Sequence, residues 1–161
     1  MSQIHYLIGD ATNPATIKGN KIIAHVCNDV GGWGAGFVLA VSKRWKLPEI
    51  CYREWSNNCE TFHLGNTQFV KLELTGDSIV VANMIAQSGI INKNNPHPLN
   101  YKALRATLTT VGLYAQKINA CVVIPDMIGC GLAGGIKGHV EDIIEHTLIA
   151  MGVDVYAYRL K

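Results

Sequence analysis

The chain has 161 residues, of which 48% are hydrophobic, so it is long enough to bury one well-developed core and too short for two ordinary domains. Charged residues make up only 16% of it, and a formal net charge of +2 is too small to hold long nucleic acid electrostatically. We therefore predict one domain over residues 1–161 and expect no nucleic-acid partner.

The first elements predicted along the chain are two strands followed by two helices. Residues 4–8 and 21–27 are short runs rich in β-branched residues, and each ends in turn-forming residues. Apolar residues recur at helical spacing over 35–45, and Pro48 then opens a second helix that runs to about residue 55. An alternation of strands and helices begins here.

Two further strands are predicted over residues 69–74 and 78–86. They are joined by Thr75-Gly76-Asp77, and because a glycine suits a hairpin turn, we expect these strands to pair antiparallel. The stretch over 92–100 holds two prolines among asparagines, and it can neither continue a strand nor begin a helix interior. We predict an exposed loop there, and a lid over a site is one role for such a loop.

The last part of the chain alternates helix and strand. An amphipathic helix is predicted over 99–117, followed by a buried apolar strand over 120–125, a helix over 139–151 and a closing strand over 153–160. Alternation of this kind is typical of a mixed, largely parallel sheet that helices cover on both faces. The predicted fold class is thus α/β, with a central sheet between two helical layers.

Four glycines fall within six residues of a first loop, which runs from residue 28 to 36 between a buried strand and a helix. Without Cβ atoms they let backbone N–H groups approach a ligand closely, and the N-terminus of the following helix adds a partial positive charge. The loop therefore suits a phosphate, although a loop bent tightly for packing alone is the alternative. Trp33 either walls off the phosphate end or anchors the loop in the core.

A second loop of the same kind, over residues 128–135, again follows a buried strand and precedes a helix. In open α/β sheets, ligands bind outside the carboxyl ends of the strands, so two such loops can meet at one crevice and hold two phosphates. Neither loop carries the Lys and Ser/Thr of a P-loop, and neither is followed by the acidic residue of a dinucleotide-binding unit. The loops therefore favour neither an ATPase nor a dehydrogenase.

Motifs spread over nearly the whole chain resemble those of macro domains, in the order and at the spacing expected of that family. The segments that carry the resemblance are Gly9-Asp10, residues 24–28, residues 31–36, Ala82-Asn83-Met84-Ile85, residues 128–135 and Val155-Tyr156. Within the family, the sequence is most similar to the subgroup of ADP-ribose 1″-phosphate phosphatases and small ADP-ribosyl hydrolases.

The resemblance implies a macro-type fold and a cleft for ADP-ribose, free or attached to a target. Asp10 would receive the adenine amino group, which agrees with the acceptor-only chemistry of a carboxylate, although a simple Gly-Asp turn is the alternative. Asn28 would face the distal ribose, and Tyr156 or Tyr158 would stack on adenine unless its ring belongs to the core. The ligand-binding residues predicted on this basis are Gly9, Asp10, Ala11, Gly31, Gly32, Trp33, Gly34, Ala35, Gly36, Ile128, Gly129, Cys130, Gly131, Leu132 and Tyr156.

Hydrolysis of an ADP-ribose derivative is the preferred hypothesis, as release of either the 1″-phosphate or an O-linked adduct. The catalytic candidates are His25, Asn28 and Asp29, beside the loop expected to hold the distal phosphate. His25 is equally suited to a hydrogen-bonded place in the core, and Asp29 to an Asx turn. The alternative function is a module that binds ADP-ribose without turnover.

Two departures from related hydrolases disfavour a lysine-dependent covalent route. Where those relatives have an aspartate after Gly-Cys-Gly-Leu this chain has Ala133, and no lysine lies near residues 86–88. The six histidines are scattered without metal-ligand spacing, so we expect neither a metal nor a cofactor.

The five cysteines form an odd set without a CxxC pair, and we expect reduced thiols. Cys27 and Cys130 lie inside the motifs, where we expect them to pack as small apolar residues in preference to acting as nucleophiles. Residues 1–10 lack a basic segment followed by an apolar stretch, and no apolar run approaches the length needed to cross a bilayer. These features favour a cytoplasmic protein without a membrane partner, and they leave the oligomeric state open.

Overall fold

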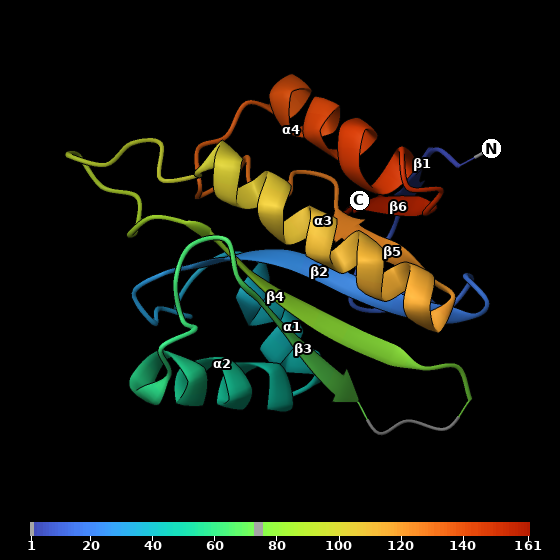
Figure 1. Ribbon diagram of the computed structural model, residues 1–161, viewed down its shortest axis with the longest axis horizontal. Helices are drawn as coiled ribbons and strands as arrows, with labels where there is room; N and C mark the ends of the chain where they lie inside the picture. The colour runs from blue at the N-terminus through green and yellow to red at the C-terminus, as the bar shows by residue number, and fades with distance from the viewer. Residues whose placement is uncertain (1, 73–75) are drawn as a thin grey trace.

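The computed structural model describes residues 2–72 and 76–161, and it places a six-stranded sheet between two layers of helices (Figure 1). The elements in chain order are β1 (Ile4–Ile8), β2 (Asn20–Asn28), α1 (Phe37–Arg44), α2 (Leu47–Asn58), β3 (Thr67–Leu72), β4 (Ile79–Gln87), α3 (Tyr101–Ile118), β5 (Ala120–Pro125), α4 (Lys137–Ile144), the π-helical turn η1 (Glu145–Ile149) and β6 (Val155–Arg159). The predicted α/β class and its three layers are confirmed.

The strands follow the order β1-β6-β5-β2-β4-β3 across the sheet. Every neighbouring pair is parallel except β3 and β4, which pair antiparallel as predicted. Of the turn predicted between those two strands, Gly76 and Asp77 are described, while Thr75 lies outside the described residues. The sheet is therefore mixed and largely parallel, with the antiparallel strand at one edge.

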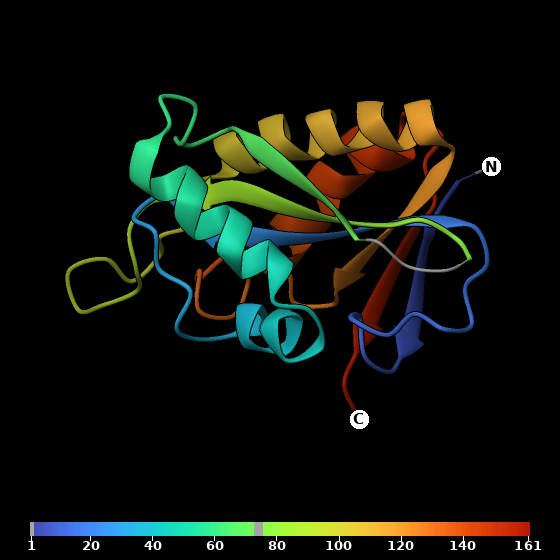
Figure 2. The same cartoon turned by 90° about the horizontal axis from the view of Figure 1, so that it is seen from below.

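Strand β2 is buried on both faces because alternate side chains enter two separate cores. Ile22 and Ala24 pack in the core that α3 and α4 cover, while Ile23 and Cys27 pack in the core under α1 and α2. Figures 1 and 2 show these two pairs of helices on opposite faces of the sheet. A long apolar strand with helices on both faces is thus the centre of the fold.

Local chemistry explains most differences between the predicted and observed ends of the helices. Helix α1 begins only at Phe37 because Gly36, with φ of +83°, has a conformation that cannot belong to a helix. Helix α3 begins two residues later than predicted, because the Asn100 side chain accepts a hydrogen bond from Ala103 N and caps the helix there. The last predicted helix begins earlier, at Lys137, and ends in the π-helical turn.

In the described part of the chain, each helix falls short of the length or the apolar character that spanning a membrane requires.

Candidate functional site

The two glycine-rich loops lie side by side at the edge of the sheet that is formed by the carboxyl ends of the parallel strands. Strands β2 and β5 are parallel neighbours, so the loops that follow them leave the sheet next to each other. The loops come close enough that a Cβ on Gly36 would lie 3.1 Å from Leu132 Cδ1. The fold therefore brings together two segments about 100 residues apart in the sequence.

A continuous cleft runs along this edge, in three compartments that share lining residues. The Asp10 compartment, of about 440 Å³, adjoins the loop compartment, of about 300 Å³, and both are lined by Phe37 and Met127. The loop compartment in turn shares Ala35 and Leu132 with the Asn28 compartment, of about 210 Å³. The cleft thus suits an elongated ligand that lies across both glycine loops.

Asp10 is held so that one carboxylate oxygen stays available to a ligand. Its Oδ1 accepts hydrogen bonds from Thr12 N at 2.8 Å and Thr12 Oγ1 at 2.7 Å. Tyr158 lines the same compartment, and its buried hydroxyl has no hydrogen-bond partner within the described residues. The Asp10 compartment therefore offers an acceptor through Oδ2, whereas the Tyr158 hydroxyl is closed off from it by burial.

Tyr158, and not Tyr156, is the tyrosine that lines this compartment. Both side chains point to the same face of β6, but Tyr156 lies one step further from the carboxyl edge, where its ring stacks on His5 at 4.7 Å. The structure thus places Tyr158, the alternative that the sequence left open, at this compartment, and contact of either tyrosine with a ligand stays a prediction.

The loop compartment is lined mainly by backbone and by small or apolar side chains, with His25 and Gln87 as the polar ones. Helix α1 points its N-terminus here, with Gly36 and Phe37 in the lining, and it has neither a side-chain cap nor an acidic residue in its first turn. A Cβ on Gly131 would meet nothing within 4 Å, so the space beside this residue is open. An anion placed here would be held by main-chain N–H groups and the helix dipole.

Asn28 lies in the third compartment, and most of its amide is used to hold the first loop. Oδ1 accepts from Val30 N at 3.1 Å, Gly32 N at 2.9 Å and the Tyr52 hydroxyl at 2.9 Å. Nδ2 donates to Gly32 O at 2.9 Å. One hydrogen of Nδ2 has no acceptor in the part of the chain described, so Asn28 can still donate to a ligand.

His25 is part of the floor beneath the loop compartment, only 1% exposed. Its Nε2 lies 2.6 Å from Asn83 Oδ1, and Asn83 Nδ2 donates to Pro48 O and Gln68 Oε1. Oδ1 must then accept from His25 Nε2–H, which sets the tautomer. Burial lowers the pKa of His25 to about 4, so the ring is neutral at neutral pH. This is the hydrogen-bonded core position that the sequence left open.

Asp29 does not line any compartment of the cleft. Its Oδ1 accepts a hydrogen bond from Gly89 N at 2.8 Å and so ties the first loop to the segment after β4. This contact gives Asp29 a turn-holding role of the kind that its residue type favours. The catalytic role predicted for it stays a prediction.

Of the other predicted ligand residues, some line the cleft and some lie outside its lining. Trp33 is 3% exposed and donates from Nε1 to Ser42 Oγ at 2.7 Å, so it anchors the loop and does not wall off the phosphate end. The predicted residues that line the cleft are Gly9, Asp10, Ala11, Gly32, Gly34, Ala35, Gly36, Ile128, Gly129, Gly131 and Leu132. Those that the structure places outside its lining are Gly31, Trp33, Cys130 and Tyr156.

All five cysteines are free. Cys27 is buried, and burial raises the pKa of its thiol well above the ordinary value, which fits a packing residue better than a nucleophile. Burial also raises the pKa of Cys130. Among residues 2–72 and 76–161, no three His, Cys, Asp or Glu side chains come together as metal ligands would.

Sequence reasoning missed the lining residues that come from β4 and the loop after it. Gln87 ends β4 and lines both the loop and Asn28 compartments, and Ile90 and Ile91 line the latter. Their loop, as predicted, is largely exposed, and it is tied to the second glycine loop by a hydrogen bond from Leu99 N to Ala133 O at 2.9 Å. A signal for Gln87 was present, because it ends a buried strand of the same parallel sheet.

Solved structures resemble this chain along its whole length. A protein of unknown function from Bacteroides thetaiotaomicron is 46% identical, with a TM-score of 0.91 and 98% of each chain covered. A macrodomain protein from Streptomyces coelicolor is 45% identical, with a TM-score of 0.82 over 97% of this chain and 98% of that one. Thermosipho africanus DarTG, solved in complex with ADP-ribose, has the same fold at 15% identity, with a TM-score of 0.80 over 99% of this chain and 42% of that one.

No family model matches the chain. A curated relative, the mouse chromodomain-helicase-DNA-binding protein 1-like, is 26% identical over 161 residues, which are 98% of this chain and 18% of that protein. The chain thus spans less than a fifth of the length of the curated relative that it matches.

Proposed function

The chain belongs to the macrodomain family, and from this premise we propose that it binds ADP-ribose or a close derivative along the cleft. The observation that carries the proposal is the order of the three compartments. A free carboxylate acceptor comes first, a middle lined by backbone comes second, and an amide comes last. This order matches adenine, pyrophosphate and distal ribose in ADP-ribose.

In this proposal the adenosine lies in the Asp10 compartment, with the adenine amino group donating to Asp10 Oδ2. Tyr158, which lines this compartment, packs against the same nucleoside. The pyrophosphate lies between the loops, against Gly36 and Gly131, where no acidic side chain opposes its charge. The ADP-ribose held by the DarTG neighbour supports the same ligand class.

A panel of ligands tests the proposal through the melting temperature, because a ligand that binds only the folded state stabilises it. At a concentration 100 times its Kd, ADP-ribose should add about 2.7 kcal/mol to the free energy of unfolding. AMP, which in this proposal reaches only the Asp10 compartment, should add less to the free energy of unfolding at the same concentration. NAD and ADP-ribose 1″-phosphate complete the panel of ligands. Equal stabilisation by AMP and ADP-ribose would remove the loop and Asn28 compartments from the proposal.

Hydrolysis at the distal ribose, of the 1″-phosphate or of an O-linked adduct, is the second candidate function. The observation that favours it is the one unused Nδ2 hydrogen of Asn28, which can orient a water molecule or a ribose hydroxyl in the Asn28 compartment. His25 is neutral and buried, and Asp29 is bonded to Gly89, so we assign them positioning roles in such a reaction. The alternative is binding without turnover.

The test of turnover is incubation of the pure protein with ADP-ribose 1″-phosphate and with an O-linked ADP-ribosyl adduct. Asn28→Asp keeps the acceptor atom Oδ1 but removes both N–H groups of Nδ2, the free one and the one bonded to Gly32 O. It should abolish product release, and it should also loosen the first loop and so weaken binding. Asp29→Ala should slow release only as far as it loosens the loop. Tight binding by the parent with no product from either substrate would select the binding module.

A further inference from the structure

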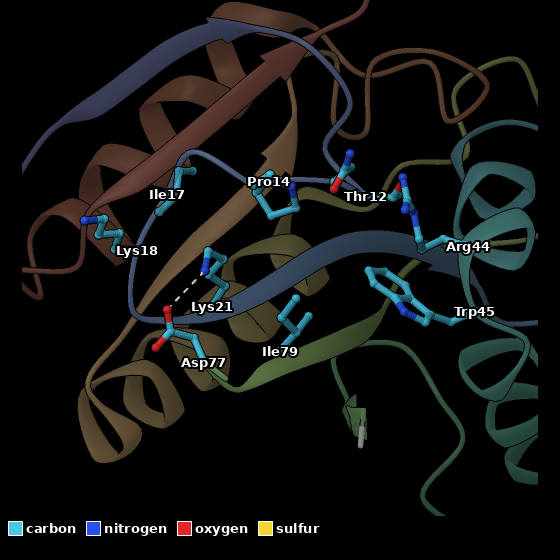
Figure 3. A pocket seen from close by; sticks show the side chains of 11 residues that line it. Thr12, Pro14, Ile17, Lys18, Lys21, Arg44, Trp45, Asp77 and Ile79 are labelled. Carbon is cyan, nitrogen blue, oxygen red and sulfur yellow. Dashed lines mark ion pairs between the residues drawn. The ribbon is translucent and has the colours of Figure 1, made fainter. Parts of the chain in front are cut away.

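A second cavity, of about 410 Å³, lies away from the cleft, at the other end of β2 (Figure 3). Its walls are the segment 12–18, the start of β2 at Lys21, and Arg44 and Trp45 where α1 ends. None of its lining residues belongs to the three compartments of the cleft. We call it the Lys21 cavity, and nothing in the proposed function uses it.

Lys21 places an ammonium group at this cavity with little solvent around it. Its side chain is 7% exposed, and Nζ donates one hydrogen bond, to Gly19 O at 2.8 Å. Nζ also forms an ion pair with Asp77 Oδ2 at 3.9 Å, a separation too long for a hydrogen bond (Figure 3). Because a buried ammonium has three hydrogens to satisfy, an anion in the cavity would be bound favourably.

The other charged residues of the lining are mostly positive. Lys18 and Arg44 add two exposed cations, while Asp77 is the single acidic residue in the lining described. Asp77 is 52% exposed and its Oδ2 already accepts a hydrogen bond from Gly19 N at 2.8 Å, so it offsets only part of this charge. The guanidinium of Arg44 presents a planar fork that suits carboxylate or phosphate.

The remaining walls hold Thr12 and Asn13 together with apolar side chains, one of which is aromatic. Trp45 stands on one side of the cavity, and Pro14, Ile17 and Ile79 complete the walls around Lys21 (Figure 3). A bare inorganic anion would leave these surfaces in water, whereas a flat apolar body would cover them.

We propose that the Lys21 cavity is a binding site for a small aromatic anion, with its phosphate or carboxylate attracted by the positive charge of Lys21 and Arg44, which stand on different sides of the cavity, and with its ring against Trp45 (Figure 3). The charge fixes one end of the ligand and the apolar walls fix the other. The site and the ADP-ribose cleft have no lining residue in common, and they touch through Thr12, which lines the Lys21 cavity and donates to Asp10.

Titration of the whole chain with phenyl phosphate, followed by ¹H–¹⁵N NMR, tests this site. The Trp45 indole N–H and the backbone amides of Ala15, Ile17 and Lys18 should shift, while the amide of Gly131 should not. Inorganic phosphate and phenol alone should each bind more weakly than phenyl phosphate. Benzoate tests whether a carboxylate can take the place of the phosphate. Shifts confined to the cleft, or none at millimolar phenyl phosphate, would overturn the proposal.

Arg44→Gln is the decisive variant, because the exposed side chain can change without a cost to the core. Loss of a charge-assisted hydrogen bond, which stabilises by about 1.5–3 kcal/mol, should weaken phenyl phosphate binding at least tenfold. Lys46→Gln is the matched control, since Lys46 is exposed and lines neither site, and it should bind as the parent does. Equal weakening in both variants would mean adsorption to a basic surface and would refute the site.

Lys21→Met removes the buried ammonium while it keeps the length of the side chain. The variant should lose phenyl phosphate binding and stay folded, because Gly19 and Asp77, the two partners of the ammonium, are exposed and can turn to water. Retained binding in a folded Lys21→Met protein would show that Lys21 only closes the turn at Gly19, and the proposal would fail.

Discussion

Asp10 couples loop structure to recognition through its two carboxylate oxygens. Oδ1 accepts hydrogen bonds from Thr12, so only Oδ2 is free to accept one from the base. Asp10→Asn can keep the acceptor toward Thr12 while it replaces the free acceptor by an NH₂ donor. We expect the variant to bind ADP-ribose about 10-fold to 100-fold more weakly, in line with the 1.5–3 kcal/mol of a charged hydrogen bond.

An inosine analogue of ADP-ribose provides the control for this prediction. Hypoxanthine carries a carbonyl oxygen where adenine has its amino group, so Asp10→Asn should bind the inosine analogue better than ADP-ribose, and the parent should show the reverse. Calorimetry on the four pairs gives the answer. A parent that does not distinguish the two ligands would contradict the assignment of Asp10 to the base.

His25 makes the stability of the fold depend on pH. Burial lowers its pKa from 6.5 to about 4, so between these values the unfolded chain takes up a proton that the folded chain does not. The contribution of His25 to the free energy of unfolding should have its full value above about pH 6.5. It should fall by about 3 kcal/mol as the pH drops towards 4.

Urea unfolding at several pH values measures this loss, with His25→Gln as the comparison because it cannot titrate and can still donate to Asn83. The difference in stability between the parent and the variant should narrow as the pH falls from 6.5 to 4. A constant difference would show that other groups cause the acid sensitivity. The same neutral ring predicts that no step of turnover between pH 6.5 and 8 follows the titration of His25.

At the scale of elements, α2 holds the first glycine loop through hydrogen bonds from two of its side chains. The Tyr52 hydroxyl lies 2.7 Å from Asn28 O and 2.9 Å from Asn28 Oδ1, and Arg53 Nη1 donates to Gly31 O at 3.4 Å. Tyr52→Phe should cost about 1 kcal/mol of stability, because it removes a hydrogen bond to a partly buried carbonyl, and it should weaken ADP-ribose binding several-fold.

Hydrogen exchange of residues 29–34 separates these two effects, since a loosened loop should exchange faster in Tyr52→Phe without ligand. Tyr156→Phe is the control, because the same hydroxyl is removed from a ring that lies outside the cleft. Unchanged loop exchange in Tyr52→Phe would mean that α2 does not position the loop.

The second glycine loop has a position where ligand binding and stability separate. Gly131 does not have a positive φ, and an added Cβ would meet no atom within 4 Å. Gly131→Ala should therefore change stability by no more than about 0.5 kcal/mol. Because the methyl group would occupy the loop compartment, affinity for ADP-ribose should fall at least tenfold.

Gly138→Ala is the matched control, since it too adds a methyl group in open space, but on α4 and away from the cleft. It should leave affinity unchanged, as measured by calorimetry. Equal affinities of Gly131→Ala and the parent would remove the second loop from the binding site.

At the scale of the whole molecule, a ligand in the cleft should act on both loops together. ADP-ribose should slow hydrogen exchange in residues 29–36 and in residues 129–135, although about 100 residues separate them, because β2 and β5 are neighbours in the sheet. AMP should slow exchange mainly near Asp10 and Tyr158. Strand β3, at the far edge, is the internal reference and should not change. Protection of one loop alone by ADP-ribose would contradict a ligand that lies across both.

Much of the fold and half of the site were readable from sequence because they depend on local chemistry. Glycines that free the backbone, strands with β-branched residues, and helical spacing of apolar side chains all act over a few residues. They predicted the order of elements, the antiparallel pair and both loops. The resemblance to macro domains supplied the ligand class and the family.

The side chains that line the cleft were decided by pairing between distant strands. Tyr156 and Tyr158 have the same residue type and the same face, and only the register with β1, which sets Tyr158 near the carboxyl edge, separates them. Asp29 was predicted from its place in the chain, but its side chain turns to Gly89, on a segment that sequence alone could not bring beside it.

The sequence by itself determined that this protein has two glycine-rich loops at strand ends and an acceptor at Asp10, since these are properties of residue type and neighbouring positions. Only the tertiary structure decided that the loops meet over one cleft, that His25 is neutral beneath it, and that Lys21 faces a second cavity. Burial and contact between distant segments have no local signature, because they arise only when the sheet assembles.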